Sequence, residues 1–362
     1  MSNSGKSLNN PKDYKCVYPY GHRYVVKYKD GYEKRPCCIS QPTKKYTQNI
    51  NDLLDNDVLQ DVRNQMESGK MPDLCSTCTL AEKNGQTSWR QRAFTELYPI
   101  NPSEGITSWD IRLDNICNLK CVMCNLDNSS KWNEDLDILK KYKNGSTADN
   151  RPKSDVNWLI DQTVNQAKHI SLLGGEPFYS KNTLYFIRQL AKHKWNRENT
   201  HISLTTNGTK ISNEWFDLLQ QFRFINITFS IDGTENVNYL IRFPTSWEQF
   251  CKSVEQVKQN KTWTYSFNTT VSALNFPVLN QIKRYARPIW FKTWLEEPSF
   301  LSINSLKPEV VQNLSGIKSI DNYIQNNYSY SELGNDTMKQ YLDDLDKRRG
   351  TDSKTVLPWC WI

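Results

Sequence analysis

The 362-residue sequence contains no apolar run that approaches the ~20 residues needed to cross a bilayer, and its first thirty residues are polar and basic. It also lacks low-complexity segments and repeats of about 20–50 residues, so a solenoid or array is not expected. A disordered chain is excluded because 12 Trp, 18 Tyr and 13 Phe residues require burial. We therefore expect a soluble, cytoplasmic protein of two or three domains that has no membrane partner.

Histidine is scarce. The sequence has His22, His169, His193 and His201 only. They are too few, and too far apart along the chain, to predict a metal site or a catalytic triad, so each is interpreted as a packing or surface residue.

Acidic residues are scarce in residues 1–50, which hold ten Lys/Arg against three Asp/Glu, and the remaining residues hold 36 of each sign. The net charge of +7 therefore belongs to this first segment. An anionic partner explains the excess, and so does a basic surface around an anionic cysteine–metal site. The cations are dispersed and no RNA-binding fold is recognisable, so nucleic acid is not expected as a partner.

The chain divides by pattern near the Tyr98-Pro99-Ile100-Asn101-Pro102 link. Before it, residues 14–39 resemble a β-rich unit with a turn at Asp30-Gly31, and Asn51 to Ser68 is expected to be helical. After it, strands alternate with helices. The expected strands are Thr107–Leu113, His169–Leu173, His201–Thr206, Phe224–Ile231, Thr264–Val271 and Ile289–Leu295, and the helices between them include Ser180–Lys194, Asn213–Phe222 and Trp247–Gln259.

Repeated strand–helix units predict an α/β fold with a parallel sheet and right-handed crossovers. Six units are too few for a closed eight-stranded barrel, so a partial (β/α)6 TIM-like barrel is expected, with its active site at the carboxyl ends of the strands. The predicted organisation is a cysteine-rich α+β module over residues 1–98, the partial barrel over 99–300 and a helical extension over 301–362.

The ten cysteines are clustered, and in a reducing cytosol they favour metal ligation or catalysis over disulfides. Cys117, Cys121 and Cys124 form a CxxxCxxC pattern in the loop expected after the first barrel strand. Three thiolates on so short a loop can ligate three irons of a [4Fe-4S] cluster and leave the fourth iron open to a ligand. The alternative is a structural zinc knuckle that borrows Cys251 or Cys360 as its fourth ligand.

With this motif, the sequence from Trp109 to Leu295 resembles the radical S-adenosylmethionine (SAM) enzymes. Four further segments match the family: the glycine-rich end of the second strand, the ends of the third and fourth strands, and the arginine segment that follows. The cofactor-binding positions that the resemblance implies are Gly174, Gly175, Glu176, Pro177, Thr206, Asn207, Ser230, Asp232 and Arg242. In the family, the glycines let the backbone approach the ligand and the carboxylate accepts the methionyl ammonium. The strand that ends at Ser230 and Asp232 commonly contacts the ribose, and the arginine pairs with the ligand carboxylate or a nearby acid.

The resemblance implies that Cys117, Cys121 and Cys124 act as the catalytic and metal-binding residues. The reduced cluster passes an electron to the sulfonium of SAM, which yields methionine and a 5′-deoxyadenosyl radical that removes a hydrogen from the substrate. A flavodoxin or ferredoxin is the expected electron donor.

The N-terminal cysteines resemble a twitch or SPASM auxiliary-cluster module over about residues 14–92. The implied ligands of a second [4Fe-4S] cluster are Cys16, Cys37, Cys75 and Cys78. The module departs from the family because it precedes the barrel, has one extra residue before Cys37 and lacks the cysteines of a second auxiliary cluster. Cys38 or Cys360 therefore remain alternative ligands, and a zinc ribbon remains an alternative to the cluster.

A peptide or protein is the expected substrate, because modules of this type commonly serve in peptide or protein modification and because the basic first segment could meet an acidic peptide. The alternative is oxidation or rearrangement of a carbohydrate or a nucleotide-linked small molecule. A cysteine-rich metal-binding interaction protein is the rival of another class. It would keep its activity after Cys117→Ala, whereas the enzyme would lose turnover.

Overall fold

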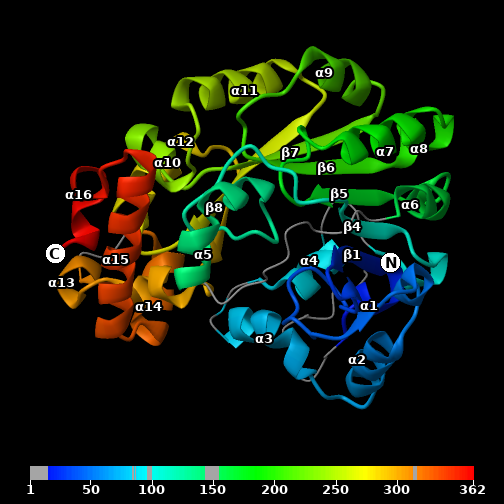
Figure 1. Ribbon diagram of the computed structural model, residues 1–362. Coiled ribbons are helices and arrows are strands. Elements are labelled where there is room, and N and C mark those ends of the chain that lie inside the picture. The colour runs from blue at the N-terminus through cyan, green and yellow to red at the C-terminus, as the bar shows by residue number, and fades with distance from the viewer. Residues whose placement is uncertain (1–14, 84, 86, 96–99, 143–154, 313–315) are drawn as a thin grey trace, which may run out of the picture.

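A computed structural model describes residues 15–83, 85, 87–95, 100–142, 155–312 and 316–362 (Figure 1). The predicted boundary at Tyr98 and Pro99 therefore lies outside the described residues. The strands are β1 (His22–Tyr28), β2 (Gly31–Glu33), β3 (Tyr46–Thr47), β4 (Ser108–Arg112), β5 (His169–Leu173), β6 (His201–Thr206), β7 (Phe224–Ser230), β8 (Thr264–Val271) and β9 (Trp290–Trp294).

The helices of the N-terminal module are α1 (Tyr18–Gly21), α2 (Asp57–Glu67), α3 (Ser76–Lys83) and α4 (Trp89–Thr95). Those that alternate with the barrel strands are α5 (Leu136–Tyr142), α6 (Val156–Thr163), α7 (Lys181–Ala191), α8 (Lys194–Asn199), α9 (Asn213–Leu219), α10 (Glu235–Ile241), α11 (Trp247–Gln259) and α12 (Leu279–Tyr285). The C-terminal helices are α13 (Pro308–Val311), α14 (Lys318–Asn327), α15 (Glu332–Arg349) and α16 (Ser353–Val356). No described helix is long and apolar enough to span a membrane.

One sheet joins all nine strands, in the order β3-β2-β1-β4-β5-β6-β7-β8-β9. The strands from β4 to β9 pair in parallel, each with the next along the chain. The six barrel strands expected from the sequence are therefore confirmed, and the edges at β3 and β9 leave the described sheet open. The partial (β/α) barrel is the fold of this part of the chain.

Strand β1 was not expected in this sheet. It forms the predicted hairpin with β2, and its other edge pairs in parallel with β4, so that His22 lies opposite Ser108 and Val26 opposite Arg112. The N-terminal segment thus contributes a seventh parallel strand, and the sheet continues across the predicted domain boundary. Figure 1 shows the N-terminal elements in blue beside β1 and β4.

The two faces of the sheet differ because alternate residues point to opposite sides. Ile170, Leu172, Ile202 and Leu204 belong to the large apolar core, which also includes residues of helices α7, α9 and α11. The intervening residues on the opposite, concave face of β5–β8 are polar for the most part. They are His169, Ser171, Leu173, His201, Ser203, Thr205, Phe224, Asn226, Thr228, Ser230, Thr264, Ser266, Asn268 and Thr270.

Most of the helix predictions hold, with differences at the ends. The expected helix over Asn51–Ser68 is split: a 3-10 turn covers Ile50–Leu53, and α2 starts after Asn56, whose side chain accepts a hydrogen bond from the Leu59 backbone N–H at 3.1 Å. An Asn that bonds the backbone in this way favours an N-cap over a helix interior. The predicted Ser180–Lys194 helix ends at Ala191, whereas Trp247–Gln259 is α11 as predicted.

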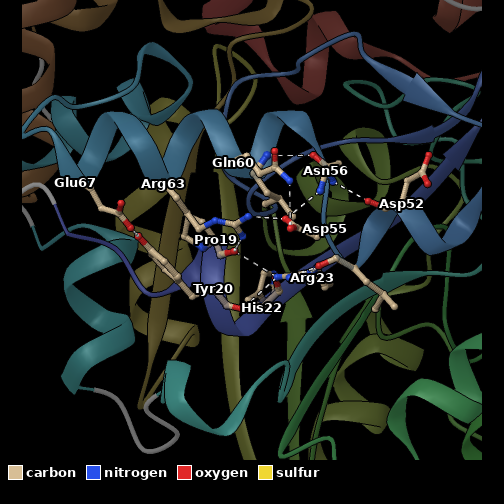
Figure 2. Close-up of polar contacts among 12 residues, drawn as sticks. Pro19, Tyr20, His22, Arg23, Asp52, Asp55, Asn56, Gln60, Arg63 and Glu67 are labelled. Carbon is tan, nitrogen blue, oxygen red and sulfur yellow. Dashed lines mark hydrogen bonds and ion pairs between the residues drawn. The ribbon is translucent and has the colours of Figure 1, made fainter.

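Two arginines fasten α1 and β1 to the segment that leads into α2 (Figure 2). Arg23 donates from Nε to the Leu54 carbonyl at 2.8 Å and from Nη1 to the His22 carbonyl at 2.6 Å. Arg63 on α2 donates to the Pro19 carbonyl at 3.2 Å and pairs with Asp55. These bonds link α2 and the segment before it to α1 and β1.

Candidate active site

The CxxxCxxC motif lies in the loop that follows β4, as expected. Its ends are closed by backbone and side-chain bonds: Asn115 donates from Nδ2 to the Leu126 carbonyl at 2.8 Å, and the Cys117 N–H donates to Ser130 Oγ at 3.3 Å. Ser129 caps the 3-10 turn after the loop by accepting from the Lys131 N–H, and its hydroxyl donates to the Leu119 carbonyl. Ser129 therefore both caps the turn after the motif and holds the cysteine loop by a hydrogen bond.

Of the three cysteines of this loop, Cys121 is buried, and Cys117 and Cys124 are partly buried. Burial raises the pKa of Cys117 to about 12, with the nearby Cys121 and Glu176 adding to the rise, and it also raises the pKa of Cys121. The Leu119 N–H opposes this effect by donating to Cys117 Sγ at 3.4 Å. Because burial raises their pKa, such thiols stay protonated in the metal-free protein. They become thiolates when a metal replaces their protons.

The loop is tied to the segment that holds the predicted arginine. The Lys120 N–H donates to the Phe243 carbonyl at 2.7 Å, and the Val122 N–H donates to the Ile241 carbonyl at 2.8 Å. Arg242 lies between these two bonds, so the same contacts that hold the cysteine loop also position its guanidinium.

Arg242 pairs with a nearby acid, one of the two predicted alternatives. Its Nη1 lies 2.6 Å from Asp232 Oδ2, while its buried Nε has no hydrogen-bond partner. Burial alone would lower the pKa of Arg242, but Cys121 and Asp232 outweigh burial and the pKa is raised. The side chain therefore stays charged beside Cys121 and retains one donor.

Asp232 is itself almost fully buried. Besides Arg242 it accepts from the Thr270 N–H at 2.8 Å, and its own N–H donates to Asn238 Oδ1 at 3.2 Å. The carboxylate thus joins the carboxyl ends of β7 and β8. Ser230 ends β7 two residues earlier, and its expected contact with a ribose stays a prediction.

Gly174 and Gly175 at the end of β5 lie against the cysteine loop. Gly174 has φ +124°, where an L side chain is strained, and a Cβ at Gly175 would overlap the Ile116 carbonyl and the carbonyl carbon of Asn115. The Glu176 N–H donates to that Ile116 carbonyl at 2.7 Å. In this structure the glycines allow a close approach between two segments of the chain itself, which brings the Gly-Gly-Glu-Pro segment, including the buried Pro177, to the cysteines.

Glu176 connects β5 to β6. Its buried carboxylate accepts from Thr206 Oγ1 at 2.8 Å, from the Asn207 N–H at 2.6 Å and from the Phe178 N–H at 3.2 Å. Burial raises the pKa of Glu176 to about 7, and these three donors oppose the rise. The carboxylate has room for about one further donor, given four lone-pair sites.

Asn207 brings the end of β6 to the first cysteine. Its Nδ2 donates to Asn118 Oδ1 at 2.8 Å and lies 3.9 Å from Cys117 Sγ. The predicted residues at the ends of β4, β5, β6 and β7 are therefore linked to one another by hydrogen bonds and lie around the cysteine loop.

A second group of cysteines lines a small cavity of about 20 Å³ in the N-terminal module. Cys16, Cys37, Cys75 and Cys78 all contribute to its wall, together with the apolar Met66. Burial raises the pKa of Cys37 and of Cys75 to about 12. The four residues predicted as one ligand set are thus brought to one cavity by the structure.

The cavity also has a cation and backbone donors at its wall. Arg90 lines it and pairs with Glu82 at 2.5 Å, and the backbone N–H groups of Trp89 and Arg90 hydrogen-bond to Cys78, which partly offsets the rise of its pKa by burial. Hydrogen bonds to sulfur and a nearby positive charge are features that stabilise thiolate-bound clusters.

The two alternative ligands lie elsewhere. Cys38 hydrogen-bonds to Asp110 of β4, and burial is the main reason that its pKa is raised. Cys360 is buried with its Sγ 3.7 Å from the Ala273 carbonyl. Neither lines the cavity.

The interpretation of the histidines was incomplete, because three of them lie in one row of the sheet. Parallel register places His22, Ser108, His169 and His201 in one row across β1, β4, β5 and β6. His22 Nδ1 lies 2.9 Å from Ser108 Oγ, and Nε2 lies 3.6 Å from Asp110. Burial lowers the pKa of His22 to about 4, so it is a neutral packing residue near neutral pH. The shared HIS tripeptide that begins β5 and β6 was the available signal.

Comparison with known proteins finds a family match within the barrel. Residues 111–280 match the model of the Radical SAM superfamily. The chain is 24% identical over 247 residues to the uncharacterised protein MJ0907 of Methanocaldococcus jannaschii, a match that covers 68% of this chain and 77% of that protein.

Two solved structures show looser similarity. The structure of anSMEcpe with bound AdoMet and the Kp18Cys peptide is 18% identical with a TM-score of 0.41, covering 67% of this chain and 61% of its own. Streptococcus suis SuiB bound to S-adenosylmethionine is 15% identical with a TM-score of 0.37, covering 66% of this chain and 47% of its own. The chain thus spans less than two thirds of the length of either solved protein.

Proposed function

We propose, from the match of residues 111–280 to the Radical SAM superfamily, that the chain is an enzyme that cleaves SAM at a [4Fe-4S] cluster held by Cys117, Cys121 and Cys124. The observation that carries the proposal is the position of the three thiols. They lie on one loop at the carboxyl end of β4, beside the charged Arg242, whose Nε is buried without a partner. An unsatisfied buried donor next to three ligands on one loop fits a bound anionic group.

The donor set also fits a cluster better than a single ion. In the described part of the chain, no three His, Cys, Asp or Glu side chains come close enough to hold one metal ion. A zinc site needs its donors at about 2.0–2.3 Å from a common centre, whereas a cubane spaces its thiolates over different irons.

When bound, the cluster and SAM supply reductive cleavage of the sulfonium to methionine and a 5′-deoxyadenosyl radical, which abstracts hydrogen from the substrate. The residues of this chain bind and orient. Arg242 offers its Nε to a carboxylate, and the Gly174–Pro177 segment presents backbone groups and Glu176 to the ammonium. Thr206 and Asn207 hold Glu176 in place, and we assign Ser230 and Asp232 to the ribose on the resemblance alone.

We further propose that Cys16, Cys37, Cys75 and Cys78 hold an auxiliary [4Fe-4S] cluster. Their shared cavity and the N–H donors to Cys78 support a metal site here, and the resemblance to twitch and SPASM modules favours a cluster over a zinc ribbon. Such a cluster would take an electron from the product or anchor the substrate.

A peptide or protein is the substrate class that we propose. The resemblance of the N-terminal module to twitch and SPASM modules supports it, and so does the concave face of β5–β8. This face presents hydroxyl and amide groups such as Ser203, Asn226 and Asn268, and no Lys or Arg. These hydroxyl and amide groups can hydrogen-bond a peptide backbone or a sugar hydroxyl, and the resemblance of the N-terminal module favours the peptide.

The assay for SAM cleavage is production of 5′-deoxyadenosine by anaerobically reconstituted protein with dithionite and SAM. Wild type is expected to form it and the Cys117→Ala/Cys121→Ala/Cys124→Ala variant to form none. Cys251→Ala, which changes a cysteine outside both groups, is the matched control and should retain activity. Equal formation by wild type and the triple variant would contradict the proposal.

The substrate class is tested by isotope transfer. Deuterated peptide and deuterated small-metabolite pools are supplied separately, and 5′-deoxyadenosine is analysed by mass spectrometry. Deuterium should enter the product from the peptide pool. Deuterium transfer from the metabolite pool alone would contradict a peptide substrate and indicate a small molecule.

A further inference from the structure

A buried group of three charges lies beneath the cysteine loop. Asp135 Oδ1 is 2.9 Å from Lys120 Nζ, and Asp135 Oδ2 is 3.0 Å from both Nε and Nη2 of Arg349. The side chains of Asp135 and Arg349 are 1% and 2% exposed, and that of Lys120 is 9% exposed. Lys120 comes from the CxxxCxxC motif, Asp135 from the turn before α5, and Arg349 is the last residue of α15.

The group carries an excess of positive charge, because two cations share one buried carboxylate. Glu134 also lies 3.3 Å from Lys120, but it is half exposed and pairs with Lys131 as well. Solvent screens Glu134 far more than it screens Asp135. About one positive charge is therefore left uncompensated within the protein beside the motif.

Arg349 is fixed toward the cysteines by its packing. Its guanidinium lies over the rings of Trp132 and Phe243, at 4.8 and 5.1 Å from their centroids. The carbonyl of Phe243 accepts the Lys120 N–H. The charge of Arg349 also acts on Cys121, where it opposes the rise in thiol pKa that burial causes.

Helix α15 makes a second contact with the loop. Buried Tyr341 donates from its hydroxyl to the Val122 carbonyl at 2.8 Å. Figure 1 shows α15, coloured orange to red, beside α5. The C-terminal extension therefore contacts the cysteine loop through a hydrogen bond and a buried charge.

We propose that Arg349 is a positioning residue of the barrel cluster: through Asp135 and Lys120 it holds the CxxxCxxC loop, and its charge makes the reduction potential of the bound cluster less negative. The inference rests on the proposed function, since it assumes a cluster at Cys117, Cys121 and Cys124. The potential of an iron–sulfur cluster depends on the net charge and hydrogen bonds around it, so a buried cation favours the reduced state, which bears one more negative charge.

The test is a redox titration of the full-length, reconstituted protein, followed by electron paramagnetic resonance. The signal that changes on addition of SAM identifies the cluster with an open iron, so the auxiliary cluster does not confuse the readout. Wild type is compared with Arg349→Gln, Arg349→Lys and Asp135→Asn. The matched control is Arg348→Gln, which removes the neighbouring arginine, 42% exposed and paired with Asp137.

The midpoint potentials of Arg349→Gln and Asp135→Asn are expected to shift in opposite directions. Arg349→Gln removes the excess charge and should make the midpoint potential more negative, and Asp135→Asn increases the charge and should make it less negative. Arg349→Lys should restore a potential close to wild type, and Arg348→Gln should leave it unchanged. A variant that merely damages the fold would lose the signal without a shift of predictable sign.

The inference is overturned if Arg349→Gln keeps the SAM-sensitive signal at the wild-type potential, or if Asp135→Asn and Arg349→Gln shift in the same direction. If Arg349→Gln does not assemble a cluster, the other two variants test the inference. It is then overturned if the midpoint potential of Asp135→Asn is not less negative than that of wild type, or if that of Arg349→Lys is far from wild type. A wild-type protein without any SAM-sensitive signal would instead contradict the proposed function.

Discussion

At the scale of single residues, the candidate site is built from groups whose ordinary behaviour the fold changes. Glu176 is a buried carboxyl with three donors, Arg242 is a largely buried cation whose Nε has no hydrogen-bond partner, and Cys117 is a thiol whose pKa burial raises. The charged or polar group of each residue is held by hydrogen-bond partners from neighbouring strand ends or from the cysteine loop. Their chemistry is therefore sensitive to changes of one or two atoms.

Glu176→Gln should flatten the pH dependence of stability. The folded-state pKa is raised from 4.5 to about 7, so the contribution of this group to folding is fully present below about pH 4.5 and is lost as pH rises through about 7. Wild type should lose on the order of 3 kcal/mol relative to Glu176→Gln over that window. Urea unfolding of the metal-free protein between pH 5 and 8 measures the slopes, with Glu198→Gln on an exposed helix face as the control. Parallel slopes for wild type and Glu176→Gln would refute the role of burial.

Gly175→Ala should displace the cysteine loop, because the added methyl group overlaps the Ile116 carbonyl. Overpacking of this kind costs typically about 1–3 kcal/mol. We expect loss of most of the iron held by the barrel site, measured as iron per chain after reconstitution. Gly105→Ala is the control, since a Cβ there meets nothing within 4 Å and only the positive φ of 79° opposes it. Full iron content in Gly175→Ala would show that the close approach is not required.

The site residues were predictable from the sequence to the extent that a motif fixed them. Cys117, Glu176 and Arg242 follow from pattern and resemblance. Nothing in the sequence indicated Arg349, because its partner Asp135 lies more than two hundred residues earlier and only the packing of α15 joins them. The row of histidines was missed because separation along the chain was taken as separation in space, although parallel register aligns His169 with His201.

At the scale of elements, the strands were easier to predict than the helix ends. The six barrel strands follow from short apolar runs that alternate with helical patterns. Strand β1 was expected to form only a hairpin, since the Arg23–Tyr28 run has no local signal for its parallel partner β4, which lies some eighty residues later. The expected helix over Asn51–Ser68 has apolar spacing throughout, and the break at Asn56 comes from side-chain capping that this spacing does not reveal.

Asn56→Ala should destabilise α2. Its side chain accepts from the Leu59 N–H at 3.1 Å, and loss of an N-cap costs about 1 kcal/mol. Asn64→Ala, the same change on the exposed face of the same helix, should be neutral within about 0.5 kcal/mol. Equilibrium urea unfolding of the two variants gives the comparison. Equal destabilisation by Asn56→Ala and Asn64→Ala would show that the Asn56 cap does not determine where α2 starts.

At the scale of the whole molecule, one sheet connects two groups of cysteines. The N-terminal group lines a cavity whose wall includes Tyr18 of α1, the helix that leads into β1, and the CxxxCxxC loop follows β4, the strand that pairs with β1. The C-terminal helix α15 reaches the same loop through Tyr341 and Arg349. The predicted modules at either end of the barrel are thus both in contact with the strands or loops that form the candidate site.

The proposal that the two groups of cysteines hold two separate iron–sulfur clusters is tested by counting iron, acid-labile sulfide and zinc per chain in anaerobically purified protein. Three proteins are compared: wild type, Cys117→Ala/Cys121→Ala/Cys124→Ala, and Cys16→Ala/Cys37→Ala/Cys75→Ala/Cys78→Ala. The two-cluster assignment predicts about eight irons and eight sulfides in wild type and about four of each in both variants. A wild-type protein with about four irons and one zinc, or a triple variant with an unchanged iron count, would contradict it.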